Sequence, residues 1–314
     1  VIGVTESGPI RVADRYTYLP LVGIFIMIAW GLAEVLAHRG YGRRAFAAIA
    51  CAVSIAVAGL SLQQARYWKD SVALMSRAVD LRPDNWVALN NLGDALEEAG
   101  RQDEAIETLR QAVRAKPDYA KSHFNLGNAL AASGDHEAAA AGYREAIRLR
   151  PEYAGAHHNL GVVLERLDKP DEAIAHYRIA VELEPSYGQA YRHLGDALVK
   201  AGSHGKALEA YETYLLLEPE DAAMHNQVGD MMMRSGRLND AIDYYEAALR
   251  IEPDLAETHN NLGVTLARVG RLEEAVAHFK KAMQLDPELV GAQRNLAMAM
   301  EMLRDSQQKS LGNE

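Results

Sequence analysis

The chain has 314 residues, of which 49% are hydrophobic, and it carries a formal net charge of −10 at pH 7. Residues 1–68 contain six arginines and three acidic residues, a charge of +3, so the remaining residues carry −13. Binding to a nucleic-acid backbone requires a basic surface, and this acidity therefore excludes nucleic acid as a general partner. The single cysteine, Cys51, can form no internal disulfide.

Two long apolar stretches occur near the start of the chain. Residues 19–37 contain one charged residue, Glu34, and residues 45–62 contain none. A helix needs about 20 predominantly apolar residues to cross a bilayer. The stretches therefore predict two transmembrane helices, over about 19–37 and 45–62, within a membrane segment that comprises residues 1–68. A buried helical hairpin in a soluble protein is the alternative interpretation.

Positive charge between the two stretches predicts the orientation of this segment. Arg39, Arg43 and Arg44 lie in the short loop that joins them, and such loops stay on the cytoplasmic side of a membrane. Both ends of the hairpin would then face outward, where the tyrosine and tryptophan residues beside the stretches are typical of a membrane interface. We expect a multi-pass protein of the inner or plasma membrane, with its C-terminal part on the extracytoplasmic side.

A proline recurs every 34 residues in the remainder of the chain. The seven positions are Pro83, Pro117, Pro151, Pro185, Pro219, Pro253 and Pro287. A fixed period of this length is typical of an array of helix–turn–helix repeats. It predicts a half unit over 69–85, six full repeats over 86–289 and a capping helix over 290–303, followed by a disordered polar tail over 304–314.

Residues 86–119 show how one unit is built. Leu89, Leu92 and Leu96 form one apolar face of a first helix. Gly100 ends that helix, and a second helix runs to just before Pro117. A glycine in the first helix lets the paired helix approach closely, and it recurs as Gly93, Gly127, Gly161, Gly195, Gly229 and Gly263.

These positions resemble the tetratricopeptide repeat (TPR) family over residues 69–303. A bulky residue of the second helix adds to the match, as Leu109, Tyr143, Tyr177, Tyr211, Tyr245 and Phe279. The resemblance implies an all-α fold, a right-handed superhelix or α-solenoid, whose first helices line a concave groove. Such arrays offer an extended surface to a protein or peptide partner.

One position of the first helix, just before the Leu-Gly pair, carries a hydrogen-bonding side chain in every repeat. We call this set the ladder, and its members are Asn91, Asn125, Asn159, His193, Gln227, Asn261 and Asn295. A carboxamide offers both a donor and an acceptor, so a row of them can hold a peptide backbone. The ladder resembles that of O-linked N-acetylglucosamine transferases, which implies an extended peptide bound along the groove. Alternatively, these side chains bond the neighbouring repeat.

A basic residue also recurs once per repeat. We call this set the basic row, and its members are Arg166, Lys200, Arg234 and Arg268. The row suits acidic groups on a partner. Alternatively, Asp196 and Asp230 pair within their own helices with the cations four residues later, and cations are favoured at a helix C-terminus in any case.

Histidines recur as well, at His123, His157, His225 and His259. Positions one repeat apart are separated by roughly 10 Å when helices pack normally, which is too far for shared metal ligands. We expect these side chains to pack between helices. The sequence contains no glycine-rich phosphate loop, nucleophile elbow or metal-spaced cysteine pair, and it predicts no catalytic residue, metal site or cofactor.

Residues 13–20 and 68–71 resemble the junction between membrane part and repeats in the transmembrane-and-tetratricopeptide mannosyltransferase family. That family's catalytic acidic residues lie in earlier membrane loops, so we assign no catalytic role to Asp14. The chain begins with Val1 rather than Met, which favours a fragment of a longer protein. We expect a membrane-anchored TPR scaffold that binds a protein or extended peptide. The alternative is the C-terminal part of a polytopic membrane glycosyltransferase whose repeats present acceptor proteins.

Overall fold

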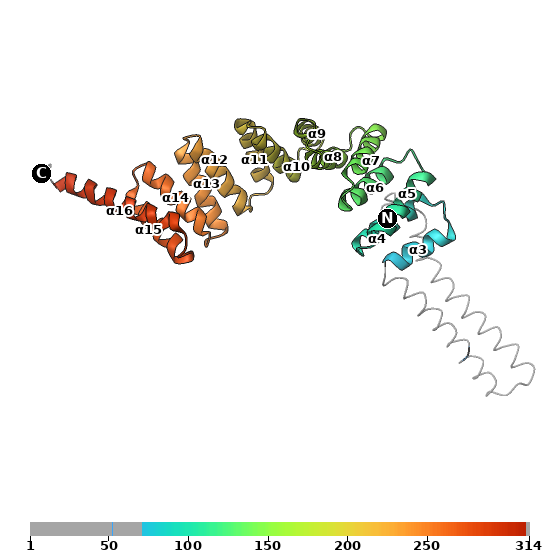
Figure 1. Cartoon of the computed structure of the whole chain (residues 1–314), viewed down its shortest axis with the longest axis horizontal. Helices are drawn as coiled ribbons and strands as arrows, with labels where there is room; N and C mark the ends of the chain where they lie inside the picture. The colour runs from blue at the N-terminus through green and yellow to red at the C-terminus, as the bar shows by residue number, and fades with distance from the viewer. Residues whose placement is uncertain (1–51, 53–70, 312–314) are drawn as a thin grey trace, which may run out of the picture. The chain divides into compact units, whose positions relative to one another are not determined.

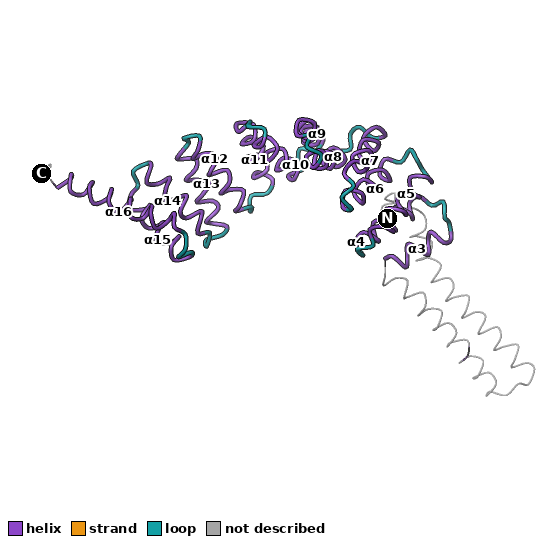
Figure 2. Tube along the Cα trace, viewed as in Figure 1, coloured by secondary structure: helices purple, strands orange, loops and turns teal. Residues whose placement is uncertain are grey.

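Helices make up the part of the chain that the computed structural model describes, namely residue 52 and residues 71–311 (Figure 1 and Figure 2). Fourteen α-helices, α3 to α16, follow one another within residues 71–311. Apart from residue 52, the transmembrane helices predicted over 19–37 and 45–62 lie outside the described residues. Among the described helices, none is long and apolar enough to cross a bilayer.

The chain divides into two compact units between Pro151 and Glu152. Unit 1 contains α3 (Ser71–Leu81), α4 (Trp86–Glu98), α5 (Gln102–Ala115), α6 (Ala120–Ala132) and α7 (His136–Leu149). Unit 2 contains α8 (Ala154–Arg166), α9 (Pro170–Leu183), α10 (Gly188–Lys200), α11 (His204–Leu217), α12 (Ala222–Arg234), α13 (Leu238–Ile251), α14 (Ala256–Arg268), α15 (Leu272–Leu285) and α16 (Val290–Leu311). From α4 to α15 the helices alternate as first and second helices of six repeats, as the 34-residue period predicts.

Each first helix packs against its second helix at the recurring glycine. A Cβ atom added to Gly229 would lie 2.7 Å from the ring of Tyr245, and one added to Gly161 would lie 2.6 Å from the ring of Tyr177. Both rings are completely buried. Only a hydrogen atom fits between such a ring and the facing helix, so the glycine sets how closely the two helices of a repeat approach.

Three residues connect the two helices of a repeat, and a residue with positive φ ends the first helix. Gly236 has a φ of 81°, and the N–H of Arg237 then donates to the carbonyl of Met232 in a Schellman-type turn. Asp168 replaces the glycine before α9 and adopts a φ of 57°, a conformation that aspartate tolerates better than most residues. Pro170 begins α9, where proline is favoured, so this turn forms without glycine.

The last helix differs from the prediction at its C-terminal end. The sequence predicted a capping helix that ends at residue 303 and a disordered tail from residue 304. Instead, α16 continues to Leu311. Residues 304–311 contain neither glycine nor proline, and Gly312 is the first residue after Leu303 that disfavours a helix.

Candidate functional site

The first helices form the inner side of each unit. In unit 1, α4 contacts α6, and in unit 2, α14 contacts both α12 and α16. Successive second helices among the described residues make no comparable contacts, so within each unit the first helices lie on the inner side of the curve. The ladder lies on this inner face, where Asn125 is buried and the other six members are half-buried.

At two positions the ladder bonds a carboxylate of the preceding repeat. Asn125 Nδ2 donates to Asp94 Oδ1 at 2.7 Å. Asn261 Nδ2 donates to Asp230 Oδ1 at 3.0 Å, and the Tyr245 hydroxyl donates to the same oxygen at 2.6 Å. These amide donors therefore connect neighbouring repeats, as the alternative interpretation of the ladder holds. The peptide-binding role of the ladder stays a prediction.

At the two ends of the ladder, the side chains form no hydrogen bond to a carboxylate of a described residue. Asn295 of α16 donates to Asn260 Oδ1 of α14 at 3.0 Å. Asn91 of α4 is half-buried and has no hydrogen bond from its side chain to another described residue.

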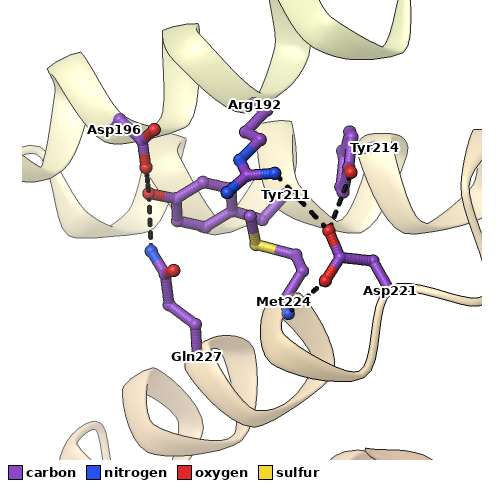
Figure 3. A network of polar contacts seen from close by, with 7 residues as sticks. All are labelled: Arg192, Asp196, Tyr211, Tyr214, Asp221, Met224 and Gln227. Atoms are coloured by element: carbon purple, nitrogen blue, oxygen red, sulfur yellow. Dashed lines mark hydrogen bonds and ion pairs between the residues drawn. The ribbon is translucent and has the colours of Figure 1, made fainter. Parts of the chain in front are cut away.

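In the middle of the ladder, where Gln227 takes the place of an asparagine, the ladder side chain bonds a tyrosine (Figure 3). Gln227 Nε2 donates to the Tyr211 hydroxyl at 2.9 Å, and that hydroxyl donates to Asp196 Oδ1 at 2.6 Å. Burial, together with the bond to Asp196, raises the pKa of Tyr211 well above its ordinary value. The tyrosine therefore keeps its proton and joins α10, α11 and α12 in one network.

Asp221 holds a second group of contacts in the same region (Figure 3). Its carboxylate accepts from the Tyr214 hydroxyl at 2.8 Å and from the backbone N–H of Met224 at 2.9 Å. The latter bond caps the N-terminus of α12. Arg192 of α10 lies 3.6 Å from the same carboxylate, so Asp221 ties the start of α12 to the two preceding helices.

A pair of histidines joins α8 to α10 on the inner face. His158 Nε2 lies 2.7 Å from Nδ1 of the ladder residue His193, and the two rings are stacked. His158 Nδ1 lies 3.0 Å from Asn159 Oδ1 and 3.0 Å from the Tyr187 hydroxyl. Because the amide oxygen can only accept, His158 donates from Nδ1 and accepts at Nε2. Burial, with a smaller effect from His193, lowers the pKa of His158 to about 4.

The basic row lies on the same side of its helices as the ladder. Each member stands seven residues after a ladder residue, which is two helical turns. All four side chains are exposed. Within the described part of the chain, Arg166, Arg234 and Arg268 form no ion pair.

The pairing within helices that the sequence offered for the basic row is wrong. Lys200 Nζ lies 2.8 Å from Glu165 Oε1 in the preceding repeat, rather than beside Asp196. Asp196 and Asp230 instead accept hydrogen bonds from the buried tyrosines of their own repeats. These carboxylates are thereby bonded to hydroxyl groups and form no ion pair with the row.

The recurring histidines bond the carbonyl oxygen of the proline six residues earlier. The contacts are His123 Nε2 to Pro117 at 2.8 Å, His225 Nε2 to Pro219 at 3.0 Å and His259 Nε2 to Pro253 at 3.0 Å. Gln293 Nε2 makes the same bond to Pro287 at 2.8 Å. The side chains thus fix the loop between repeats to the following first helix, a role that the sequence did not predict although the spacing of six residues is visible in it.

Family models match much of the repeat array. A model described as TPR repeat matches residues 93–134 and 127–168, and models described as tetratricopeptide repeat match residues 74–107, 154–187 and 220–288. Together they cover more than half of the chain. No curated protein sequence matches it.

Solved structures with a TM-score above 0.5 share this fold. YrrB, described as a TPR protein with an unusual peptide-binding site, is 25% identical, with a TM-score of 0.55 over 60% of this chain and 97% of its own. PilF of Pseudomonas aeruginosa is 20% identical, with a TM-score of 0.54 over 68% of this chain and 97% of its own. MamA is 24% identical, with a TM-score of 0.47 over 52% of this chain and 95% of its own.

None of these structures is described as a glycosyltransferase, so the resemblances to mannosyltransferases and to O-linked N-acetylglucosamine transferases gain no support from them. The repeat itself is established by three agreeing observations. They are the proline period, the contact between the recurring glycine and a bulky side chain within each helix pair, and the matching family models. The chain belongs to the tetratricopeptide repeat family.

Proposed function

We propose that the array is a scaffold that binds a protein or an extended peptide along its inner face. The observation that carries this proposal is the basic row, because Arg166, Arg234 and Arg268 are exposed and form no ion pair with a described residue. Unpaired cations on one face favour a partner of complementary charge. An extended segment that contains Asp or Glu therefore fits this face best.

The ladder supplies the second part of this proposal. Its side chains stand two turns before the basic row and on the same side of each first helix. Several of their donors bond neighbouring repeats, and the amide oxygens of Asn159 and Asn261 already accept from the residue before them. The amide oxygens of the other members are therefore the groups best able to accept from a peptide N–H. The description of YrrB as a protein with a peptide-binding site agrees with this class of partner.

Site-specific photocrosslinking tests where the partner binds. We expect p-benzoylphenylalanine in place of Arg234 or Arg268 to crosslink the full chain to one and the same partner in its native host. The matched controls are Glu246 and Lys280, which are exposed on the second helices α13 and α15 and should give no such adduct. Equal adducts from the control positions, or none from the inner positions, would contradict the proposal.

We also propose that residues 19–37 and 45–62 anchor the array in a membrane, with the repeats on the extracytoplasmic side. The apolar composition of both stretches and the three arginines between them support this. Protease added to intact spheroplasts should then digest the repeats. Repeats that stay intact until the cells are lysed would overturn this orientation.

A further inference from the structure

A pocket opens on the outer side of unit 2, between the second helices α9 and α11. It has a volume of about 390 Å³, and its floor is made by Tyr191, Leu194 and Leu198 of α10 with Ala210 of α11. Tyr191 stands two residues before the ladder residue His193, about 200° around the helix at 3.6 residues per turn. The pocket therefore opens on the side opposite the inner face. Its volume is within the range of sites that bind small ligands or single side chains.

The pocket exists because one repeat lacks a ring pair that the other repeats of unit 2 possess. At the positions of Tyr191 and Ala210, those repeats carry His157 with His176, His225 with Tyr244 and His259 with His278. The ring centroids of these pairs are 5.2, 5.9 and 5.1 Å apart. Ala210 offers only a methyl group in the place of the second ring, so the space above Leu194 and Leu198 is left unfilled, although both leucines are themselves buried.

Three polar groups at this pocket have no partner among the residues that the structure describes. The Tyr191 hydroxyl makes no hydrogen bond to another described residue, although the histidine at this position in other repeats bonds a proline carbonyl. Arg178 of α9 and Lys206 of α11 both line the pocket, are exposed and form no ion pair with a described residue. Glu209 is the one acidic residue in the lining, so cations and donors predominate.

An exposed leucine extends the apolar surface beside the pocket. Leu216 is 83% exposed, and it follows the lining residue Thr213 by three positions, on the same side of α11. At the corresponding position the other repeats of unit 2 carry a charged or amide side chain, namely Glu182, Arg250 and Gln284. An apolar floor, an adjoining exposed leucine and two unpaired cations thus lie together in this one repeat.

We propose that this pocket is a second binding site, separate from the inner face, which takes a peptide segment with an apolar side chain next to an Asp or Glu. The apolar side chain enters the space that a second ring fills in the other repeats. The neighbouring carboxylate accepts from Arg178, Lys206 and the Tyr191 hydroxyl. Hydrogen bonds between charged groups are about twice as strong as neutral ones, so the carboxylate selects the ligand as much as the apolar group does.

Blocked tetrapeptides test this chemistry on the full chain. The probe is glycine–phenylalanine–aspartate–glycine with both ends blocked, and its binding is followed by saturation-transfer NMR on the phenylalanine ring. We expect the analogue with asparagine in place of aspartate to bind at least about tenfold more weakly, because it lacks the charge. A glycyl-phenylalanine peptide whose only carboxylate is its free C-terminus should also bind more weakly than the probe. If it bound better, the assigned source of the carboxylate would be wrong.

Variants of the pocket locate the binding. Ala210→Tyr should abolish binding of the probe, since it supplies the ring that Tyr244 supplies in the next repeat, and Arg178→Gln should weaken binding several-fold. Arg110→Gln changes an exposed arginine at the equivalent position of unit 1 and should have no effect. Unchanged binding by both pocket variants, or equal binding of the aspartate and asparagine peptides, would overturn the proposal. Because Arg178→Gln changes a surface side chain, its result does not depend on how well Ala210→Tyr folds.

Discussion

Replacement of Gly229 by alanine is expected to lower the free energy of unfolding by about 1–3 kcal/mol, the usual cost of an overpacked core. The added Cβ would lie 2.7 Å from Cε1 and 2.8 Å from Cδ1 of Tyr245. In a helix with free space, the same substitution stabilises by up to about 1 kcal/mol, because alanine is the better helix former. We therefore expect the substitution to destabilise the protein, although helix propensity alone would make it stabilising.

The Tyr245 ring cannot easily move aside to make room for the methyl group. It is 0% exposed, and its hydroxyl donates to Asp230 Oδ1 at 2.6 Å. Asp230 is itself held by Asn261 from the next repeat. Displacement of the ring would break a partly buried hydrogen bond and disturb the contact between two repeats.

Gly205 provides the matched control for this substitution. It lies in α11, and a Cβ atom added there meets nothing within 4 Å. Gly205→Ala should leave stability unchanged or raise it by about 0.5 kcal/mol. Chemical denaturation of both variants measures the difference. A Gly229→Ala protein as stable as the wild type would show that the helices can separate at no cost, contrary to the packing described above.

Acidification from pH 7 to pH 5 is expected to lower the free energy of unfolding by about 2 kcal/mol through His158 alone. Burial lowers its pKa from 6.5 to about 4 in the folded protein. Between these values the unfolded chain binds more protons than the folded one. The contribution of His158 is therefore complete above pH 6.5 and is lost as the pH falls toward 4.

Three other histidines should also lower the free energy of unfolding as the pH falls. Burial is the largest cause that lowers the pKa values of His193, His259 and His278. The wild-type loss of stability between pH 7 and pH 5 should therefore exceed that from His158 alone.

His158→Asn separates the contribution of this residue from that of the other histidines. Denaturation midpoints of this variant at pH 5 and pH 7 should lie closer together than those of the wild type. His204 is exposed at the start of α11, and His204→Asn should retain the wild-type pH dependence. A wild-type midpoint that does not change between the two pH values would contradict the buried neutral state of the histidine pair.

The fold of the repeats could be predicted because the same residue types recur at the same positions of each repeat. The proline period, the glycine of the first helix and the bulky residue of the second helix all follow from contacts within one unit. Even the turn at Asp168 was predictable, since Pro170 can begin a helix where the glycine is absent. The end of α16 was not predicted. No partner helix determines where α16 stops, so the helix continues until the first residue that disfavours it, Gly312.

The contacts between repeats were harder to predict than the repeats. One of the two interpretations of the basic row paired Lys200 within its own helix, but its partner Glu165 lies 35 residues earlier. That partner depends on how one first helix is rotated against the next, which the period does not determine. A signal was nevertheless present for Tyr211 and Tyr245, since an aspartate precedes each by 15 residues and accepts a hydrogen bond from its hydroxyl.

The outer pocket escaped prediction because it arises from an exception rather than from the period. Ala210 and Tyr191 are both ordinary in an α-helix, and neither disturbs the repeat pattern. Only a comparison with the ring pairs of the neighbouring repeats shows what is missing.

The order in which a partner contacts successive repeats tests most directly whether it binds as an extended chain along the inner face. Mass spectrometry can identify the partner residue that is crosslinked from positions 166, 234 and 268. Repeats packed roughly 10 Å apart and an extended chain at about 3.3 Å per residue predict an advance along the partner of about three residues for each repeat. Crosslinked residues that advance in the order of the repeats would agree with binding along the inner face. Crosslinks from all three positions to one partner residue, or in no order, would contradict it.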